Sequence, residues 1–171
     1  SPSRGLGDVY KRQPEDWDKL MRINATGAYN CLHYGLPLMR LHREGLVINI
    51  SSIAGLRASH LGGVAYNASK FAMNALGTSA AGDELPNNIR ITTICPGEVD
   101  TPILNNRPLP PDAKARATMM APDDVANVIV LCAAMPQRTL VSEMDLMHPQ
   151  QRDTTKHIQA TRDISSTDQQ I

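Results

Sequence analysis

The chain is poor in the features that mark several common classes of protein. It has one Phe, one Trp and four Tyr, a small aromatic supply, although its apolar fraction of 42% is typical of a globular protein. Its 17 basic and 17 acidic residues balance, so nothing indicates binding to nucleic acid or to an anionic membrane surface. No apolar run approaches the roughly 20 residues that a membrane span needs. We therefore expect neither nucleic acid nor a membrane as a partner.

Cysteine is scarce as well. Cys31, Cys95 and Cys132 lie far apart and show no C-x-x-C spacing, so we expect neither disulfides nor a zinc site. The five histidines are scattered, and His33 and His42 do not repeat at ligand spacing. The sequence therefore predicts no metal site, and a reducing cytoplasm is the expected compartment.

The two ends of the chain show no apolar periodicity. The stretch Asp8–Gln13, DVYKRQ, resembles the translation of a transposon-end adapter used to fragment DNA for sequencing. We interpret residues 1–13 as a non-native or disordered segment, and a natural basic N-terminal arm is the alternative. Residues 151–171 are polar and predict a disordered tail. The domain is thus expected to span residues 14–150.

Between these ends, short branched apolar runs alternate with helical patterns. Strands are expected at Leu46–Ile50, at Ile89–Cys95 and within 139–147, and helices over 14–44, over 65–85 and from Pro122 onward. Pro37 favours a bend or a break in the first helical stretch. The alternation predicts an α/β fold in which right-handed βαβ units form a parallel sheet covered by helices on both sides.

Polar residues gather where the expected strands end. Ser51 and Ser52 follow the first strand, and Pro96-Gly97 follow the second. Ligands of such sheets bind beyond the carboxyl ends of the strands. The motif YNASK opens the intervening helix near the same edge, and residues four apart on a helix share one face, so Tyr66 and Lys70 should project together. Such a pair can arise by chance, but this position favours chemistry.

Together, INISSIAG, YNASK and CPGEVDTP resemble the short-chain dehydrogenase/reductase family, which has a Rossmann-like doubly wound parallel sheet. The resemblance extends over about residues 14–150. It implies an oxidoreductase that moves a hydride between NAD or NADP and an alcohol or carbonyl substrate, and a homodimer or homotetramer as the full-length protein. VSEMDLMHPQ stands where many members end in Asp-Gly-Gly, which resembles the branch acting on hydroxy acids and small alcohols or aldehydes.

The resemblance also implies a catalytic tetrad of Asn24, Ser52, Tyr66 and Lys70. A phenol is a poor acid or base at neutral pH, but the Lys70 ammonium and the positive nicotinamide ring would both favour the phenolate. Tyr66 would then be the general acid in reduction and the base in alcohol oxidation. Ser52 would stabilise charge on the substrate oxygen, Lys70 would hold the ribose hydroxyls, and Asn24 would anchor a water that links Lys70 to solvent.

Two members of this tetrad have a plain structural alternative. Ser52, like Ser51, could simply cap a turn, and the loop from Ser52 to Tyr66 is one residue longer than in many members of the family. Asn24 could be a solvent-facing helix residue.

A second group of residues is assigned to the cofactor by the same resemblance. The segment that would meet the nicotinamide carboxamide, mostly through backbone groups and a Thr hydroxyl, contributes Pro96, Gly97, Val99 and Thr101, beside Tyr66 and Lys70. The loop from Ile103 to Met120 would be the substrate lid. Its charged residues could meet an anionic substrate or be solvated: Arg107, Lys114 and Arg116.

The sequence departs from the family at its start. No G-x-G-x-x-G-like segment precedes an expected helix, so the chain is expected to hold only the C-terminal catalytic part of the Rossmann-like fold and to be inactive by itself. The residue that selects NAD or NADP is missing with that half. The alternative hypothesis is a non-catalytic half-domain that pairs through its helices, residues 14–44 and 65–85, with itself or with a partner.

Overall fold

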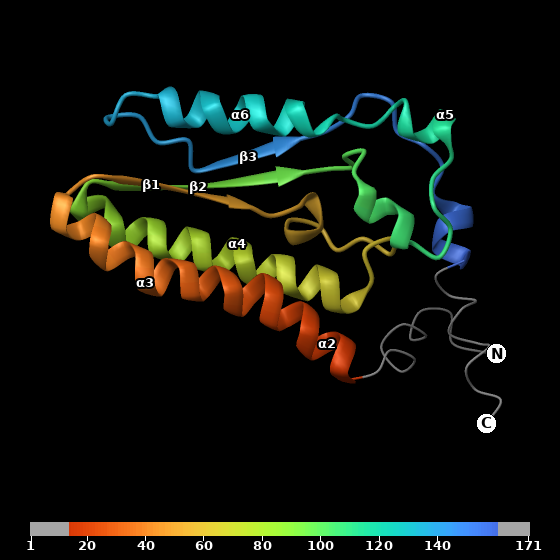
Figure 1. The fold of residues 1–171 in the computed structure, drawn as a ribbon, viewed down its shortest axis with the longest axis horizontal. Coiled ribbons are helices and arrows are strands. Elements are labelled where there is room, and N and C mark those ends of the chain that lie inside the picture. The colour runs from red at the N-terminus through yellow and green to blue at the C-terminus, as the bar shows by residue number, and fades with distance from the viewer. Residues whose placement is uncertain (1–13, 161–171) are drawn as a thin grey trace.

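The computed structural model describes residues 14–160 and shows a parallel sheet between layers of helices (Figure 1). Within these residues the strands are β1 (Gly45–Ile50), β2 (Ile89–Pro96) and β3 (Glu143–Leu146), in the order β1-β2-β3. Both pairings are parallel, and Val47 of β1 lies opposite Ile91 of β2. The α/β prediction is confirmed as a partial Rossmann-like sheet. The third strand is shorter than the expected stretch of 139–147.

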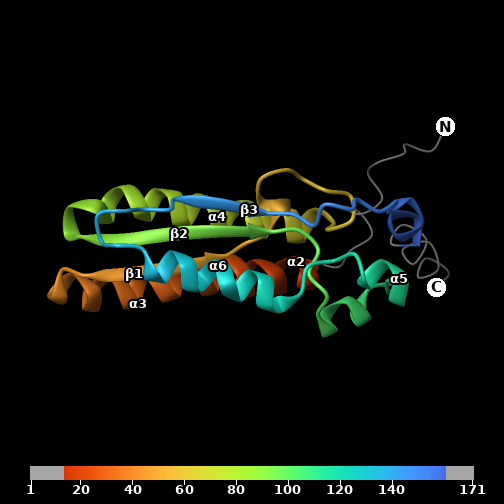
Figure 2. The same cartoon turned by 90° about the horizontal axis from the view of Figure 1, so that it is seen from above.

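The helices cover the two faces of this sheet (Figure 1). One face carries α3 and α4, and the other carries α6; Figure 2 shows the same layers from above. A π-helix connects α2 to α3, and short 3-10 turns follow β1, α4 and β2. The helices are α2 (Pro14–Leu20), the π-helix Met21–Thr26, α3 (Gly27–His42), α4 (Val64–Glu84), α5 (Ala113–Arg116) and α6 (Pro122–Ala134).

The core lies between α3 and the centre of the sheet. Leu32 and Leu36, one turn apart on α3, pack against Ile89 and Ile91 of β2, which is buried along its whole length. Burial of each such aliphatic side chain is worth about 1.5–3 kcal/mol. Pro37 does not interrupt α3, which continues to His42. The packing of Leu32 and Leu36 stabilises the helix against the loss of one backbone hydrogen bond.

An ion pair fixes the ends of α3 and α4 to each other. Glu84 closes α4 and is 1% exposed. Arg40 of α3 donates from Nε to both carboxylate oxygens, at 3.1 and 3.0 Å, and Asn87 donates to Oε2 at 3.0 Å. A buried carboxylate is tolerated when its lone pairs are filled in this way. The contact therefore sets how α3 lies along α4.

The end of the chain departs from the expected disordered tail over residues 152–160. Residues 155–160 form a short helix, and Arg152 reaches back to Glu98 with two hydrogen bonds of 2.7 Å. Disorder was predicted because the polar composition of this segment provides no apolar face. Composition does not reveal that an arginine of the segment pairs with a carboxylate from a distant part of the chain. The predictions for residues 1–13 and 161–171 lie outside the described residues and stay predictions.

We predict that Gly55→Ala destabilises the fold, because Gly55 lies against the backbone of α4. A Cβ there would stand 2.7 Å from the Lys70 carbonyl oxygen and 3.0 Å from Asn74 Oδ1. Overpacking of this kind costs about 1–3 kcal/mol, which urea denaturation would measure. The control is Gly82→Ala, within α4, where nothing lies within 4 Å; there we expect no loss or a gain of up to about 1 kcal/mol. Equal effects of the two changes would contradict the contact.

Candidate active site

Tyr66 and Lys70 lie side by side on the first two turns of α4. The Lys70 Nζ atom is 5.9 Å from the centroid of the Tyr66 ring. The helix begins beside the carboxyl edge of the sheet, where ligands of parallel sheets bind. The geometry thus places a phenol and an ammonium together at this edge, while their catalytic role stays a prediction.

Lys70 is held by the end of β1. Its Nζ donates to the Ile50 carbonyl oxygen at 3.1 Å, and the residue is 9% exposed. Burial lowers the pKa of the Lys70 ammonium below its ordinary value, because the charged form loses hydration. The strand end therefore fixes the direction of the Lys70 side chain.

Asn24 lies in the π-helix and contacts α4 through a residue that the sequence analysis did not single out. Its Nδ2 donates to Ser69 Oγ at 3.0 Å, and Ser69 Oγ donates to the Tyr66 carbonyl oxygen at 2.8 Å. Ser69 is fully buried. The structure thus brings Asn24 to the neighbour of Lys70, not into solvent. The available signal for Ser69 was that it is part of YNASK, but a small hydroxyl in a helix predicts no particular partner.

The two serines after β1 have different roles. Ser52 Oγ accepts a hydrogen bond from the Ala54 N–H at 3.1 Å, so Ser52 does cap the turn Ile53–Gly55. Ser51 Oγ donates instead to the Lys70 carbonyl oxygen at 3.4 Å. A capping hydroxyl still has its own hydrogen to donate. The cap therefore fixes the position of Ser52 Oγ and leaves it able to donate to a substrate oxygen.

The segment assigned to the cofactor leaves the sheet at the end of β2, and backbone bonds hold it on both sides. Gly97 donates to the Leu146 carbonyl oxygen at 2.8 Å, and the residues flanking Val99 bond with the Met120 backbone at 3.2 and 2.8 Å. A Cβ on Gly97 would lie 3.1 Å from Met147 Sδ and 3.3 Å from the Leu146 carbonyl oxygen, so the segment runs close against the end of β3. In chain order the predicted residues of this segment are Pro96, Gly97, Val99 and Thr101.

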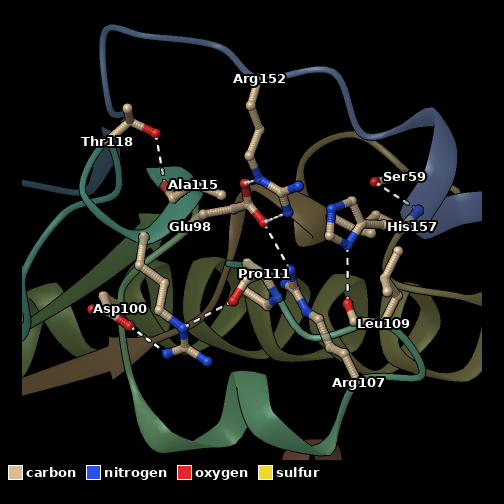
Figure 3. A network of polar contacts seen from close by, with 12 residues as sticks. Ser59, Glu98, Asp100, Arg107, Leu109, Pro111, Ala115, Thr118, Arg152 and His157 are labelled. Atoms are coloured by element: carbon tan, nitrogen blue, oxygen red, sulfur yellow. Dashed lines mark hydrogen bonds and ion pairs between the residues drawn. The ribbon is translucent and has the colours of Figure 1, made fainter. Parts of the chain in front are cut away.

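Two of the three lid cations are engaged within the protein (Figure 3). Arg107 Nη1 bonds to Glu98 Oε1 at 2.8 Å, and Arg152 holds both oxygens of the same carboxylate at 2.7 Å. Arg116 pairs with Asp100 at 2.6 Å. The expectation that these cations are simply solvated is therefore wrong for Arg107 and Arg116. Lys114 is exposed.

A pocket of about 330 Å³ opens beside Tyr66. Its wall combines the start of the lid with the loop before α4, the end of α2 and the short C-terminal helix, so the segment expected to be disordered closes one side of it. The lining residues are Leu20, Leu61, Gly62, Tyr66, Ile103, Leu104, Asn106, Arg107, Pro108, Leu109 and His157. Volumes of this size suit small ligands.

The residues that the structure describes show neither a metal centre nor a membrane segment. No group of three or more His, Cys, Asp or Glu side chains in 14–160 is arranged to hold a metal ion. None of the helices in that range combines the length and the apolar character that crossing a bilayer requires. The candidate site therefore consists of the edge formed by β1, β2 and α4 and the adjoining pocket.

We predict that the Glu98 cluster makes stability depend on acid pH. Burial opposes ionisation, but hydrogen bonds from Arg152 and Arg107 outweigh it and lower the pKa of Glu98 from 4.5 to about 2. The ionised carboxylate therefore stabilises the fold above about pH 4.5, and this contribution disappears as the pH falls toward about 2. Urea denaturation should show the unaltered chain about 2–3 kcal/mol more stable than Glu98→Gln at neutral pH.

This difference should shrink steadily below about pH 4.5. Glu15→Gln, at the exposed start of α2, controls for the loss of one negative charge. A difference between the unaltered chain and Glu98→Gln that stays constant down to about pH 2.5 would contradict the contribution of the ionised carboxylate.

Comparison with known proteins places this geometry in a family. The model of the short chain dehydrogenase family matches residues 4–111. The short-chain dehydrogenase/reductase olcF of Penicillium canescens is 38% identical over 100 residues, which cover 58% of this chain and 38% of that protein. A 3-oxoacyl-[acyl-carrier protein] reductase with bound NAD from Brucella melitensis superposes with a TM-score of 0.68 at 26% identity, covering 82% of this chain and 53% of the other.

A metagenomic short-chain oxidoreductase in complex with NADP is also similar. The superposition has a TM-score of 0.66 at 29% identity, and it covers 84% of this chain and 56% of the chain of the oxidoreductase. The chain thus spans about half or less of the length of these proteins. The family match extends over more than half of the chain and includes YNASK and CPGEVDTP, and the chain belongs to the short-chain dehydrogenase family.

Proposed function

We propose that the protein to which this chain belongs is an oxidoreductase that moves a hydride between a nicotinamide cofactor and an alcohol or carbonyl substrate. One observation carries the proposal: Tyr66, beside the Lys70 ammonium, forms part of the wall of a pocket at the carboxyl edge of the sheet. An acid/base group next to a cation and a small cavity is the arrangement that carbonyl reduction needs.

In this mechanism the side chains move a proton and position the reactants. Tyr66 donates its phenolic proton to the carbonyl oxygen in reduction and accepts it in alcohol oxidation. The Lys70 ammonium stands 5.9 Å from the Tyr66 ring, and the Ser52 hydroxyl donates to the same substrate oxygen. Asn24 holds the start of α4 through Ser69. We assign its side chain a positioning role, and the water relay that the family resemblance implies stays a prediction.

The described residues fit a nicotinamide cofactor at the sheet edge. Gly97 packs closely against Met147 and the Leu146 carbonyl oxygen, and the backbone around Val99 is bonded to Met120, so this segment is held in place at the edge where a flat ring and its carboxamide would lie. NAD or NADP would supply or take up the hydride. Lys70 would hold the ribose hydroxyls, and Thr101 would donate its hydroxyl to the carboxamide. The two neighbours described with bound NAD and with NADP support either dinucleotide.

The outer surface of α2 and α3 supports a homodimer or homotetramer. Several large apolar side chains stand exposed on it, from Trp17 at 41% to Leu41 at 79%. Exposed apolar side chains gathered on one helical stretch are the kind of surface that interaction sites use. The alternative function, a non-catalytic half-domain, would use the same surface, whose exposed members are Trp17, Ile23, Tyr29, Tyr34, Leu38 and Leu41.

We predict that Tyr66→Phe lowers turnover by about 10²–10⁴-fold, the usual contribution of a general acid or base. The enzyme tested is the chain joined upstream of Pro14 to a glycine-rich cofactor-binding half, and the readout is the absorbance of the reduced nicotinamide. Tyr34→Phe, on exposed α3, removes the same hydroxyl away from the site and should leave turnover unchanged. Near-normal turnover by Tyr66→Phe would overturn the mechanism. An extended protein that binds the dinucleotide but turns over no alcohol or carbonyl would favour the alternative.

A further inference from the structure

The loop before α4 forms one wall of the pocket and lies against the Tyr66 ring. Leu61 and Gly62 of this loop line the pocket beside Tyr66. A Cβ on Gly62 would stand 2.9 Å from Tyr66 Cδ1 and 3.6 Å from Tyr66 Cε1, so the backbone of the loop packs directly on the ring. The direction in which the phenol points therefore depends on where this loop lies.

Asn67, the residue after Tyr66, holds that loop in place. Its Oδ1 accepts a hydrogen bond from the Ser59 N–H at 3.2 Å, and its Nδ2 donates to the Ser59 carbonyl oxygen at 2.9 Å. One side-chain amide thus fills both backbone groups of a residue that lies outside the helices and strands. We call this pair of hydrogen bonds the Asn67 clamp.

Hydrogen bonds within the loop connect the Asn67 clamp to Gly62. The Ser59 carbonyl oxygen also accepts from the Gly62 N–H at 3.2 Å, and Ser59 Oγ accepts from the Leu61 N–H at 3.2 Å. On the other side, a Cβ on Gly62 would lie 3.1 Å from Asn67 Oδ1. Ser59, Gly62 and Asn67 therefore form one small unit, and this unit packs against the Tyr66 ring through Gly62.

We propose that Asn67 is a positioning residue for the reaction: its clamp places Gly62 against the Tyr66 ring and so aims the phenol at the reacting oxygen. The proposal rests on the oxidoreductase function above, because it needs Tyr66 as the acid or base. A general acid acts only within hydrogen-bond reach of that oxygen, about 2.6–3.2 Å. A misplacement of about 1 Å can lower a rate by about 10²-fold.

A carboxamide suits the Asn67 clamp because it offers an acceptor and a donor side by side. Asn67→Asp keeps the acceptor for the Ser59 N–H, but it sets a second oxygen against the Ser59 carbonyl oxygen, so the loop should move away from Tyr66. An acidic residue near the start of a helix is favourable, and this variant should therefore retain α4 and the fold. Asn67→Ala removes both hydrogen bonds.

The effect of Asn67 on Tyr66 is measured first in the 171-residue chain, without cofactor. In the unaltered chain we expect a nuclear Overhauser effect between the Gly62 α protons and the Tyr66 ring protons. Asn67→Asp and Asn67→Ala should weaken or abolish it, while the signals of the sheet residues stay in place. Asn30→Ala, exposed on α3, is the matched control and should leave it unchanged. An effect that persists in both Asn67 variants, or that the unaltered chain lacks, overturns the proposal.

Kinetics of the extended enzyme, the chain joined to a cofactor-binding half, separate positioning from stability. Asn67→Asp should lower kcat about 10- to 100-fold and leave KM for the nicotinamide cofactor nearly unchanged. In a Tyr66→Phe background the same change should cost less than about twofold, since the phenol that it misplaces is gone. Full additivity of the two changes overturns the proposal, because a loop that matters only for folding would lower turnover equally in either background.

The two measurements also distinguish this proposal from the oxidoreductase function. If Tyr66→Phe lowers turnover and Asn67→Asp does not, the positioning role is refuted and the oxidoreductase function stands. If the Overhauser effect depends on Asn67 but the extended enzyme turns over no alcohol or carbonyl, the proposed oxidoreductase is refuted, and the positioning role is refuted with it.

Discussion

The contact between the carboxyl end of β1 and the first turns of α4 is the constraint on which the candidate site depends. Lys70 Nζ bonds to the Ile50 carbonyl oxygen, and Ser51 Oγ bonds to the Lys70 carbonyl oxygen. Gly55 lies against the same peptide group with no space for a side chain. Strand end, turn and helix are therefore fixed around one residue. The buried ammonium is tolerated because a backbone carbonyl replaces part of its hydration.

A second junction, at Glu98, controls the other side of the site. Its carboxylate joins the segment after β2 to the lid through Arg107 and to the C-terminal segment through Arg152. Each partner comes from a different part of the chain, so the pocket wall exists only when all three segments are in place. Two arginines on one partly buried carboxylate compensate its desolvation. The same cluster thus stabilises the fold and forms part of the pocket wall through Arg107.

Much of this arrangement could be predicted from local patterns. The strands Leu46–Ile50 and Ile89–Cys95 and the helix 65–85 were recognisable because short buried runs and helical periodicity are properties of neighbouring residues. The Tyr66–Lys70 pair was recognisable for the same reason, since one helical turn fixes its geometry. Where the prediction was wrong, the deciding interaction was distant. Within the described part of the polar tail, residues 152–160, Arg152 is bonded to Glu98, and Arg116 of the lid is paired with Asp100.

The sequence by itself determined the order of strands and helices, the residues at the carboxyl edge of the sheet and the pair on the first turns of α4. These depend on period, composition and spacing along the chain. Only the tertiary structure decided which serine caps the turn, that Asn24 meets Ser69, and that Arg107 meets Glu98 at the wall of a pocket. Those outcomes depend on contacts between residues far apart in sequence. The free energy of a polar side chain is set by the partner it meets after folding, and the residue type alone does not name that partner.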